Sequence, residues 1–318
     1  MKDVILITGV AGMVGSNLLE KYIQQNKIIV GIDNFELGRK KFIKDYLKFE
    51  NFYFFKINLS KKIIDKNLKK ILDKNSLSEI WLLAANSDIS KGIKNSYVDL
   101  DNTFLTTVNS IEFLKSYIKK KTKILFTSTS AIYGNVNRPV SENNSMMAPV
   151  SNYGAMKLAS EAYISSFSFL YNVNTFIFRF PNVVGKNLTH GLLFDMKRKI
   201  NAKKNYLNVL GNGKQQKPYS HVNEILNCMI FLKKKNYKKN LNIFNIGTND
   251  KGMKVNEIVS IMLKNYNSNK KIKFGKKNIG WKGDIPTYRY NTKKINNLGF
   301  KFKMNSKDSI IKAIKENI

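Results

Sequence analysis

The sequence predicts an α/β protein in which helices cover both faces of a doubly wound parallel sheet. Up to Phe180, short runs of β-branched and aromatic residues alternate with longer amphipathic stretches. The first run, over 4–7, leads directly into a turn rich in glycine. Strands that alternate with helices form parallel sheets whose strands are buried on both faces. The 318 residues exceed a typical single core, so one large domain or two joined domains are expected.

The predicted elements follow one another in order along the chain. The first strand and the glycine turn precede an amphipathic helix over 14–25. Later strands of the regular part are predicted at 28–32, 52–57, 80–83, 124–127 and 175–178, and its longest helices at 101–119 and 153–171. Beyond Phe180, loops punctuated by glycine precede a helix near 223–234, a strand over 242–246, a helix over 255–266 and a final short helix.

The chain divides into two predicted parts. Residues 1–182 carry the regular alternation of strands and helices and are assigned to a cofactor-binding domain. Residues 183–318 belong mainly to a smaller α/β domain for the substrate, and 219–247 are expected to return to the first domain. Because no linker-like segment separates the two parts, we expect them to be interleaved in sequence.

The formal net charge of +33 comes almost entirely from lysine. The 55 Lys and Arg residues face only 22 Asp and Glu residues, and just five of the 55 are arginine. Sites that read phosphates or base edges favour arginine, because its planar group makes bidentate hydrogen bonds. Since the lysines are spread along the whole chain, we predict a solvated lysine coat and no nucleic-acid partner.

Cysteine and histidine content and the hydropathy pattern exclude further classes of protein. The single cysteine, Cys228, rules out an intrachain disulfide, and two histidines are too few for a Cys/His zinc site. No metal is therefore expected. No run approaches the ~20 apolar residues that span a bilayer, and no cleavage pattern of a signal peptide precedes the first strand. We expect a cytoplasmic protein without a membrane partner.

Gly9, Gly12 and Gly15 lie between the first predicted strand and helix with the spacing G-x-x-G-x-x-G. Glycines there permit a tight turn, let the backbone approach a pyrophosphate and allow close packing of helix on strand. Asp33 ends the second strand 18 residues after Gly15. A carboxylate there accepts hydrogen bonds from the adenosine ribose and repels a 2′-phosphate. The pattern predicts a Rossmann-type domain that binds NAD rather than NADP.

A second group of polar residues follows the predicted strand at 124–127. Thr129 falls at the carboxyl edge of the sheet, where α/β proteins hold ligands. Tyr153 and Lys157 share one face of a predicted helix, because they are four residues apart. A nearby ammonium favours the phenolate and lowers a pKa that is ordinarily ~10. Such a phenolate can take the proton of a sugar hydroxyl while nicotinamide accepts a hydride, with Thr129 bonded to the same oxygen.

These residues resemble the extended short-chain dehydrogenase/reductase family, and within it the NAD-dependent nucleotide-sugar epimerases and dehydratases. The motifs that carry the resemblance are residues 8–15, 33–34, 82–86, 128–134, 153–157, 179–185, 244–247 and 283–286. The resemblance implies that Thr129, Tyr153 and Lys157 are catalytic. The cofactor-binding residues that it implies are Gly9, Gly12, Met13, Val14, Gly15, Asp33, Asn34, Asn58, Leu59, Leu83, Ala84, Ala85, Tyr153, Lys157 and Phe180.

The resemblance also implies a site for a nucleotide sugar, formed by Asn86, Thr129, Tyr153, Asn182 and Lys217. Asn182 matches the asparagine that binds the substrate diphosphate in this family. Lys217 stands in a segment where the family often has an arginine, and an ammonium supplies the charge without bidentate geometry. Asn58 stands where the family usually places an aspartate against adenine.

The residues after Thr129 favour epimerisation. The 4,6-dehydratases of this family usually place acidic residues there, because loss of water needs a further acid and base. This chain has Ser130 and Ala131 instead. That pattern resembles 4-epimerases such as UDP-glucose 4-epimerase. It predicts C4 epimerisation of a UDP-hexose through a transient 4-keto intermediate and reversible hydride transfer to bound NAD.

Two other functions are left open by the sequence. One is a nucleotide-sugar 4,6-dehydratase, or a 4-dehydrogenase or reductase, that acts on a GDP-, CDP- or dTDP-sugar. The other is a nucleotide-sensing or polyanion-binding protein that keeps the fold without turnover, and the complete Thr/Tyr/Lys set disfavours it.

The resemblance further implies a homodimer. Enzymes of this family commonly pack two helices of each subunit into a four-helix bundle, and the predicted helices over 101–119 and 153–171 would supply it here. Ile111, Phe113, Leu114 and Phe167 could serve either that interface or the core of a single chain.

Overall fold

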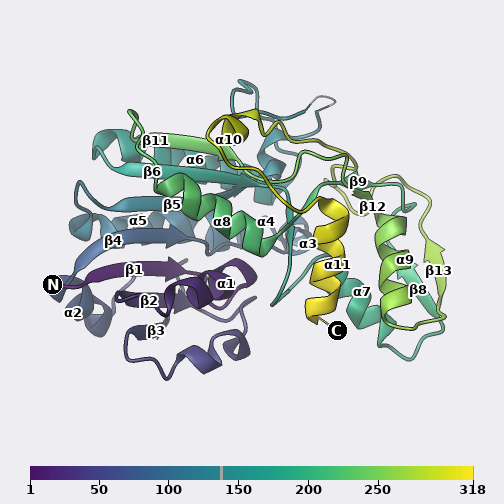
Figure 1. Ribbon diagram of the computed structural model, residues 1–318, viewed down its shortest axis with the longest axis horizontal. Helices are drawn as coiled ribbons and strands as arrows, with labels where there is room; N and C mark the ends of the chain where they lie inside the picture. Colours follow the sequence, from purple (N-terminus) through teal and green to yellow (C-terminus); the bar gives the residue numbers. More distant parts are fainter. Residues whose placement is uncertain (137–138, 318) are drawn as a thin grey trace.

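The computed structural model describes residues 1–136 and 139–317. Its centre is a seven-stranded sheet in the order β11-β6-β5-β4-β1-β2-β3, with every neighbouring pair parallel (Figure 1). The strands are β1 (Asp3–Thr8), β2 (Ile28–Asp33), β3 (Phe52–Lys56), β4 (Ser76–Leu82), β5 (Lys123–Thr129), β6 (Asn174–Phe180) and β11 (Leu241–Asn245). The predicted doubly wound parallel sheet is confirmed.

Helices cover both faces of this sheet. On one face lie α1 (Met13–Tyr22) and α8 (Val222–Lys233), and on the other lie α2 (Lys66–Lys74), α5 (Thr106–Leu114) and α6 (Asn152–Leu170). Successive residues of β1 alternate between the two cores, so that Ile7 packs in the first and Leu6 in the second. Both side chains are fully buried. Burial on both faces explains why the strands are continuous apolar runs in the sequence.

The order of the strands reverses between β1 and β4. The chain runs from β1 through β2 to β3 on one side, and then crosses back to β4 on the other side of β1. At such a point the loops after the two strands diverge and leave a crevice at the carboxyl edge of the sheet. Residues that follow β1, β2, β4 and β5 therefore converge on one end of the sheet.

A smaller lobe lies beside this end of the sheet, at the right in Figure 1. It contains α7 (Leu192–Ile200), α9 (Val255–Asn265) and α11 (Ser306–Asn317), with the strand pairs β7 (Asn182–Val184) and β10 (Tyr219–His221), β8 (Tyr206–Val209) and β13 (Lys271–Phe274), and β9 (Gln216–Lys217) and β12 (Met253–Lys254). Leu193, Ile258 and Ile310 join its three helices in a separate apolar core. Between these segments α8 and β11 return to the large lobe, and Ile318, the last residue of the predicted substrate domain, lies outside the described residues.

The predicted helix over 101–119 is wrong in its boundaries. The helical segment begins with α4 (Ser96–Asp99), passes through a π-helical turn (Leu100–Leu105) into α5 and ends in a 3₁₀ turn (Lys115–Tyr117). Asn95 caps its start, since the Oδ1 of Asn95 accepts the N–H of Tyr97 at 3.1 Å. The Thr106 hydroxyl donates to the carbonyl of Asp101, five residues earlier, at 3.1 Å. Side-chain bonds of this kind compete with the regular backbone ladder and accompany the wide turn.

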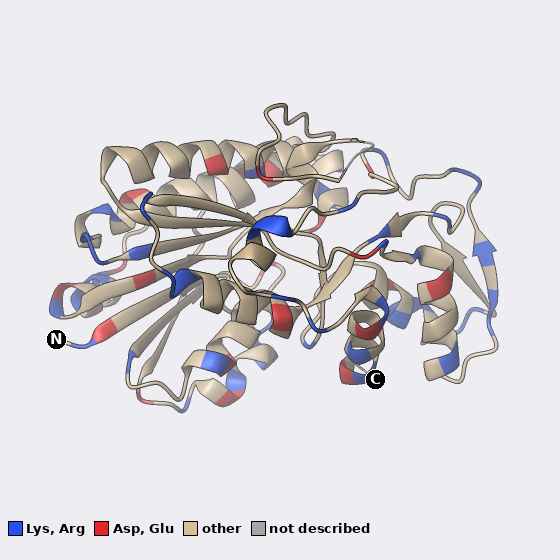
Figure 2. Cartoon of the chain, turned by 45° about the horizontal axis from the view of Figure 1, so that its top comes forward, with Lys and Arg blue, Asp and Glu red and all other residues tan. Residues whose placement is uncertain are grey.

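The remaining elements are short. They are α3 (Ile89–Lys94), α10 (Lys293–Asn297) and the 3₁₀ turns Lys40–Phe42, Lys44–Tyr46 and Ser130–Tyr133. Figure 2 shows Lys and Arg residues along the elements of both lobes, as the even spread of lysine in the sequence predicts. Within residues 1–136 and 139–317, none of the helices has the length and hydropathy that a membrane crossing requires.

We expect Ile164→Ala to lower the free energy of unfolding by about 2–5 kcal/mol, because it leaves a cavity between α6 and the sheet. Ile164 is fully buried in the core of that face. Ile64→Ala is the matched control, since Ile64 is 77 % exposed and its truncation should cost little. Urea denaturation followed by circular dichroism measures both values, and equal values for the two variants would contradict the assigned burial.

Candidate active site

The glycine turn joins β1 to α1 at the carboxyl edge of the sheet. A Cβ atom on Gly15 would lie 2.2 Å from the carbonyl oxygen of Gly9 and 2.7 Å from the Cα of Val10. Only glycine fits at that distance, so the first turn of α1 packs directly against the turn that precedes it. The N–H groups in the first turn of a helix have no partner within the helix, so the start of α1 after Gly12 can bind a pyrophosphate.

Asp33 ends β2 beside this turn and is 7 % exposed. Its Oδ2 accepts the N–H of Ala11 at 2.9 Å, and its Oδ1 accepts the N–H of Phe35 at 2.8 Å. Burial raises the pKa of the Asp33 carboxyl, and these backbone hydrogen bonds oppose the rise. A carboxylate fixed between the turn and β2 retains lone pairs for ribose hydroxyls. The turn and Asp33 therefore fit the pyrophosphate and adenosine ribose of NAD.

Thr8 fastens the segment after β4 to the segment after β1. The Thr8 Oγ1 accepts the N–H groups of Leu83 at 3.1 Å and of Ala84 at 3.2 Å. The same hydroxyl donates to the carbonyl of Trp81 at 3.3 Å. This contact brings the predicted cofactor residues Leu83 and Ala84 alongside the glycine turn, although more than seventy residues separate them in the sequence.

The other predicted cofactor residues follow the same edge at different depths. Half-buried are Gly12, Met13, Val14, Asn34, Leu83, Ala84 and Ala85. Leu59 and Phe180 are buried in the two cores of the large lobe. Asn58 is exposed, and its Oδ1 accepts the N–H of Ser60 at 3.0 Å.

The start of α6 packs against the turn that follows Thr129. A Cβ atom on Gly154 would lie 2.6 Å from the carbonyl oxygen of Ala131, so a larger residue would push the helix away. Ser151 caps the helix, since its Oγ accepts the N–H of Gly154 at 3.1 Å. Tyr153 is thereby held beside Thr129, as the sequence predicts.

Tyr153 has a pKa well above its ordinary value. Burial is the main cause, the charge of Asp99 adds to the rise, and a hydrogen bond with the Thr129 side chain opposes it. Among the described residues, the group that most directly favours the phenolate is therefore the Thr129 hydroxyl. The sequence instead predicts this effect for Lys157.

Lys157 lies one helical turn further on and is 2 % exposed. Its Nζ donates to the carbonyl of Thr127 at 2.7 Å and lies 4.6 Å from the centre of the Phe126 ring. Burial lowers the pKa of Lys157 to about 7, and the charge of Glu161 opposes that fall. The ammonium is thus directed at the end of β5, which explains why the phenol of Tyr153 depends more on Thr129.

Asn182 lies beside a tyrosine from the C-terminal part of the chain, Tyr288. The Nδ2 of Asn182 is 3.4 Å from the hydroxyl of Tyr288 and 3.4 Å from the carbonyl of Pro218. Burial raises the pKa of Tyr288 to about 12, and a hydrogen bond with the Ser130 side chain opposes the rise. Tyr288 therefore links the residue after Thr129 to the predicted diphosphate asparagine. Sequence reasoning missed Tyr288, because no local pattern marks it.

Lys217, the predicted replacement for a family arginine, is engaged in an ion pair. Its Nζ lies 2.5 Å from the Oδ1 of Asp284 and 5.2 Å from the centre of the Trp281 ring. Asp284 Oδ2 also accepts the N–H of Gly280 at 2.8 Å. The motif at 283–286 thus holds the Lys217 side chain in place.

Asn86 is buried, and its amide is already bonded within the protein. The Nδ2 donates to Asp99 Oδ1 at 2.7 Å and to the carbonyl of Asp88 at 3.1 Å, while the Oδ1 accepts the N–H of Asp88 at 3.1 Å. Asn86 therefore holds Asp99 near Tyr153. The sequence gives no sign of Asp99, which is fully buried and whose Oδ2 has no hydrogen-bond partner.

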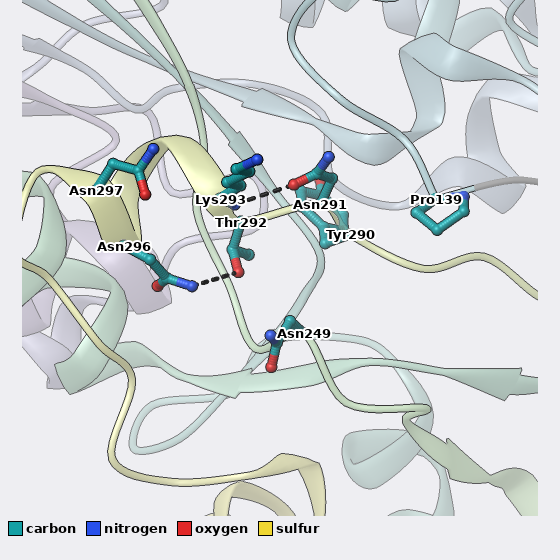
Figure 3. A pocket seen from close by; sticks show the side chains of 8 residues that line it. All are labelled: Pro139, Asn249, Tyr290, Asn291, Thr292, Lys293, Asn296 and Asn297. Atoms are coloured by element: carbon teal, nitrogen blue, oxygen red, sulfur yellow. Dashed lines mark hydrogen bonds between the residues drawn. The ribbon is translucent and has the colours of Figure 1, made fainter.

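A groove of about 420 Å³ lies outside this set of residues (Figure 3). Its walls are Pro139, Asn249, Tyr290, Asn291, Thr292, Lys293, Asn296 and Asn297. It contains none of the predicted catalytic, cofactor or substrate residues. Within it, Asn296 Nδ2 donates to the Thr292 hydroxyl at 3.4 Å, and Asn291 Oδ1 accepts the N–H of Lys293 at 3.0 Å.

The fold and the site define a dinucleotide-binding protein of the doubly wound class, with a Thr/Tyr/Lys set at the carboxyl edge of the sheet. The model of the NAD dependent epimerase/dehydratase family matches residues 5–247, and the chain belongs to that family. The predicted family and the predicted cofactor, NAD, are both confirmed.

Two relatives and one solved structure illustrate the similarity. The chain is 26 % identical to the UDP-glucuronate 4-epimerase of Thermodesulfobacterium geofontis over 263 residues, 81 % of this chain and 79 % of that protein. It is 28 % identical to a putative UDP-glucose 4-epimerase of Methanocaldococcus jannaschii over 326 aligned positions, 98 % of this chain and 97 % of that protein. The structure of UDP-glucuronic acid 4-epimerase from Bacillus cereus, in complex with UDP-glucuronic acid and NAD, superposes with a TM-score of 0.84 at 22 % identity, covering 98 % of each chain. At 22 % identity, the similarity to the Bacillus cereus structure shows that the two chains share a fold.

We expect Asp33→Asn to weaken NAD binding by about tenfold or more, because an amide nitrogen would face an N–H that now donates to a carboxylate. Glu36→Gln is the control, since Glu36 is exposed and, among residues 1–136 and 139–317, its carboxylate accepts only from Asn102, at 3.1 and 3.3 Å. Isothermal titration with NAD gives the two affinities. Unchanged affinity in Asp33→Asn would remove Asp33 from the cofactor site.

Proposed function

We propose that this chain is an NAD-dependent nucleotide-sugar 4-epimerase that acts on a UDP-hexose. The observation that carries the proposal is the set formed by Thr129 at the end of β5 with Tyr153 and Lys157 on α6. After Thr129 come Ser130 and Ala131 in place of acidic residues. The Ser130 side chain lies beside Tyr288, and neither Ser130 nor Ala131 supplies the carboxylic acid that loss of water would need. The two relatives named above are 4-epimerases of UDP-sugars by name, which supports the same reaction.

Tyr153 takes the proton of the sugar 4-hydroxyl. Because burial raises the pKa of Tyr153, the phenolate is a strong base and needs stabilisation. The hydrogen bond with Thr129 provides the larger part of it. The buried ammonium of Lys157, one helical turn away and directed at the carbonyl of Thr127, adds positive charge. When bound, NAD supplies reversible oxidation of the sugar carbon, so the reaction has no net redox change.

The same tyrosine returns the proton to the oxygen of the 4-keto sugar. Since one side of the site serves both half-reactions, the sugar must present its opposite face between them while the nucleotide stays bound. Asn182 and Lys217 are the residues proposed to hold the diphosphate during this turn. The Lys217–Asp284 pair is close to neutral as a unit, so Lys217 contributes directed hydrogen bonds more than net charge.

Asn86 has an indirect role in the proposed site. Asn86, which we assigned to the substrate site, acts there through Asp99 and the segment at 86–88, because its amide is bonded within the protein. The nucleotide proposed is UDP, and we propose that the enzyme works in the cytoplasm without a nucleic-acid or membrane partner.

We also propose a homodimer formed through α5 and α6. Phe169 and Leu170, at the end of α6, are 86 % and 69 % exposed, and such neighbouring apolar side chains favour a covered surface. Ile111, Leu114 and Phe167 are buried in the core of this chain, and Phe113 packs against the same core. The interface would therefore be formed by the end of α6 more than by Ile111, Phe113, Leu114 and Phe167.

Purified protein incubated with UDP-glucose, UDP-galactose and UDP-glucuronate should interconvert one pair of C4 epimers. The products are separated by chromatography, and absorbance at the NADH band is followed in parallel. Stoichiometric growth of NADH with a keto-sugar product would replace the proposal with a 4-dehydrogenase, and a 4-keto-6-deoxy product would replace it with a dehydratase.

Tyr153→Phe should lower kcat by about 10²–10⁴-fold, because the general base is removed while the ring remains. Tyr163→Phe is the matched control on the same helix, since its hydroxyl donates to Glu112 at 2.6 Å, away from Thr129. Steady-state kinetics on the preferred substrate give both values. Equal activity of the two variants would exclude Tyr153 as the base.

Phe169→Glu should convert the dimer to a monomer, because a carboxylate would be buried at the proposed interface without a partner. Met146→Glu is the control, at a methionine that is 78 % exposed and lies in a loop outside α5 and α6. Light scattering after size exclusion measures the mass of each. A wild-type monomer at micromolar concentration would contradict the proposed assembly.

A further inference from the structure

A buried ion pair lies one helical turn beyond Lys157. Glu161 is 4 % exposed, and both of its oxygens are bound by Arg179 of β6, which is 2 % exposed. Arg179 Nε donates to Glu161 Oε1 at 3.0 Å, and Arg179 Nη2 donates to Glu161 Oε2 at 2.7 Å. Because residues four apart share one face of a helix, the carboxylate of Glu161 is the neighbouring charge for the ammonium of Lys157.

Arg179 reaches a third segment of the site as well. Its Nη1 donates to the hydroxyl of Tyr133 at 2.9 Å, and that hydroxyl donates to Asn245 Oδ1 of β11 at 2.6 Å. Tyr133 closes the 3₁₀ turn that begins at Ser130. Arg179 therefore joins α6, the turn after Thr129 and the edge strand β11 through one buried guanidinium.

Stability alone is a weak reason for such a pair. Two charges removed from water lose hydration that their attraction only partly restores, and well-packed apolar residues often replace buried pairs without loss. The pair lies instead between a buried lysine of the proposed site and the turn that carries Thr129. Its position thus favours an electrostatic role toward Lys157.

The other titratable groups around the pair are few among the described residues. Beyond Tyr133 lie Glu142, whose Oε1 accepts the N–H of Asn245 at 2.8 Å, and Lys294, which faces Glu142 and Arg179. Tyr290 is near Tyr133 and Arg179. On the side of the reaction, Tyr153 and Asp99 face each other. Glu161 is the carboxylate that acts on Lys157, where it opposes the fall in pKa caused by burial.

We propose that Glu161 and Arg179 are positioning residues that together set the charge of Lys157: Glu161 favours the ammonium, and Arg179 limits that effect by binding both carboxylate oxygens. The role of Lys157 in catalysis rests on the proposed function, whereas its protonation does not. A neutral Lys157 cannot stabilise a phenolate, so the pair fixes the upper pH limit of the site. Because Glu161 and Arg179 carry opposite charges, removing one should shift the pKa of Lys157 in the opposite direction from removing the other.

The protonation of Lys157 can be followed without any substrate. In protein labelled with ¹³C at lysine Cε, Lys157 should titrate near its pKa of about 7, well below the ~10.4 of lysine in a model peptide. Lys157→Arg removes its signal and so assigns it, which is needed because Lys233 and Lys294 also have lowered pKa values. The titration is repeated on Glu161→Gln, Arg179→Met and the double variant, after circular dichroism has shown that each is folded.

Glu161→Gln should move the Lys157 midpoint down by about one pH unit or more, because it removes a favourable charge and leaves Arg179 unpaired. Arg179→Met should move the midpoint up, because the carboxylate is no longer neutralised. The double variant leaves no unpaired buried charge, so it should fold even if a single variant does not. Its Lys157 midpoint should lie between that of the wild type and that of Glu161→Gln. The proposal is overturned if Glu161→Gln does not lower the midpoint, if both single variants move it in one direction, or if the double variant lies outside that interval.

A kinetic measurement separates this inference from the proposed function. Where epimerase activity is found, the alkaline limb of kcat against pH should shift down in Glu161→Gln and up in Arg179→Met, in step with the titration. Shifted midpoints without any activity on UDP-hexoses would reject the proposed reaction and support the effect of Glu161 and Arg179 on Lys157. Epimerase activity with unshifted midpoints would support the proposed reaction and reject the effect of Glu161 and Arg179 on Lys157.

Discussion

The close approach of α6 to the turn after β5 determines the geometry of the whole reaction site. Gly154 leaves so little space that a Cβ would lie 2.6 Å from the carbonyl of Ala131, and Ser151 caps the helix at the same point. Asn152 adds a hydrogen bond to the carbonyl of Gly92 at 2.9 Å, which ties α6 to α3. Tyr153 can lie beside Thr129, and Lys157 beneath it, only because the helix starts there.

Buried charge is the second feature of the site, and each buried group has a different means of support. Asp33 is held by two backbone N–H groups, whereas Glu161 is held by a bidentate guanidinium. Lys157 has a carbonyl and an aromatic ring as its nearest partners, and burial lowers its pKa to about 7. In a medium of low dielectric constant such differences of partner translate into large differences of protonation. The protonation of this site is therefore set by the packing around it.

The surface charge has a different character from these buried groups. Lys and Arg residues lie along the elements of both lobes (Figure 2), and only five of these 55 residues are arginine. Lys217, which lies in the smaller lobe, is paired with Asp284. A diffuse positive field draws in a doubly charged nucleotide sugar over a distance, but it does not position one. Under the proposed function, the position of the nucleotide sugar depends instead on Asn182, Lys217 and the groups bonded to them.

Local patterns in the sequence determined the sheet, the glycine turn with Asp33 and the Thr129, Tyr153 and Lys157 set, because spacing along one strand or helix fixes which residues share a face or an edge. The break in the helix over 101–119 was missed, since side-chain bonds such as that from Thr106 override its apolar period. Only the tertiary structure placed Asp99 near Tyr153, Tyr288 between Ser130 and Asn182, and Arg179 on Glu161. These contacts join segments far apart in the chain, and a single sequence carries no pattern for a meeting that packing alone decides.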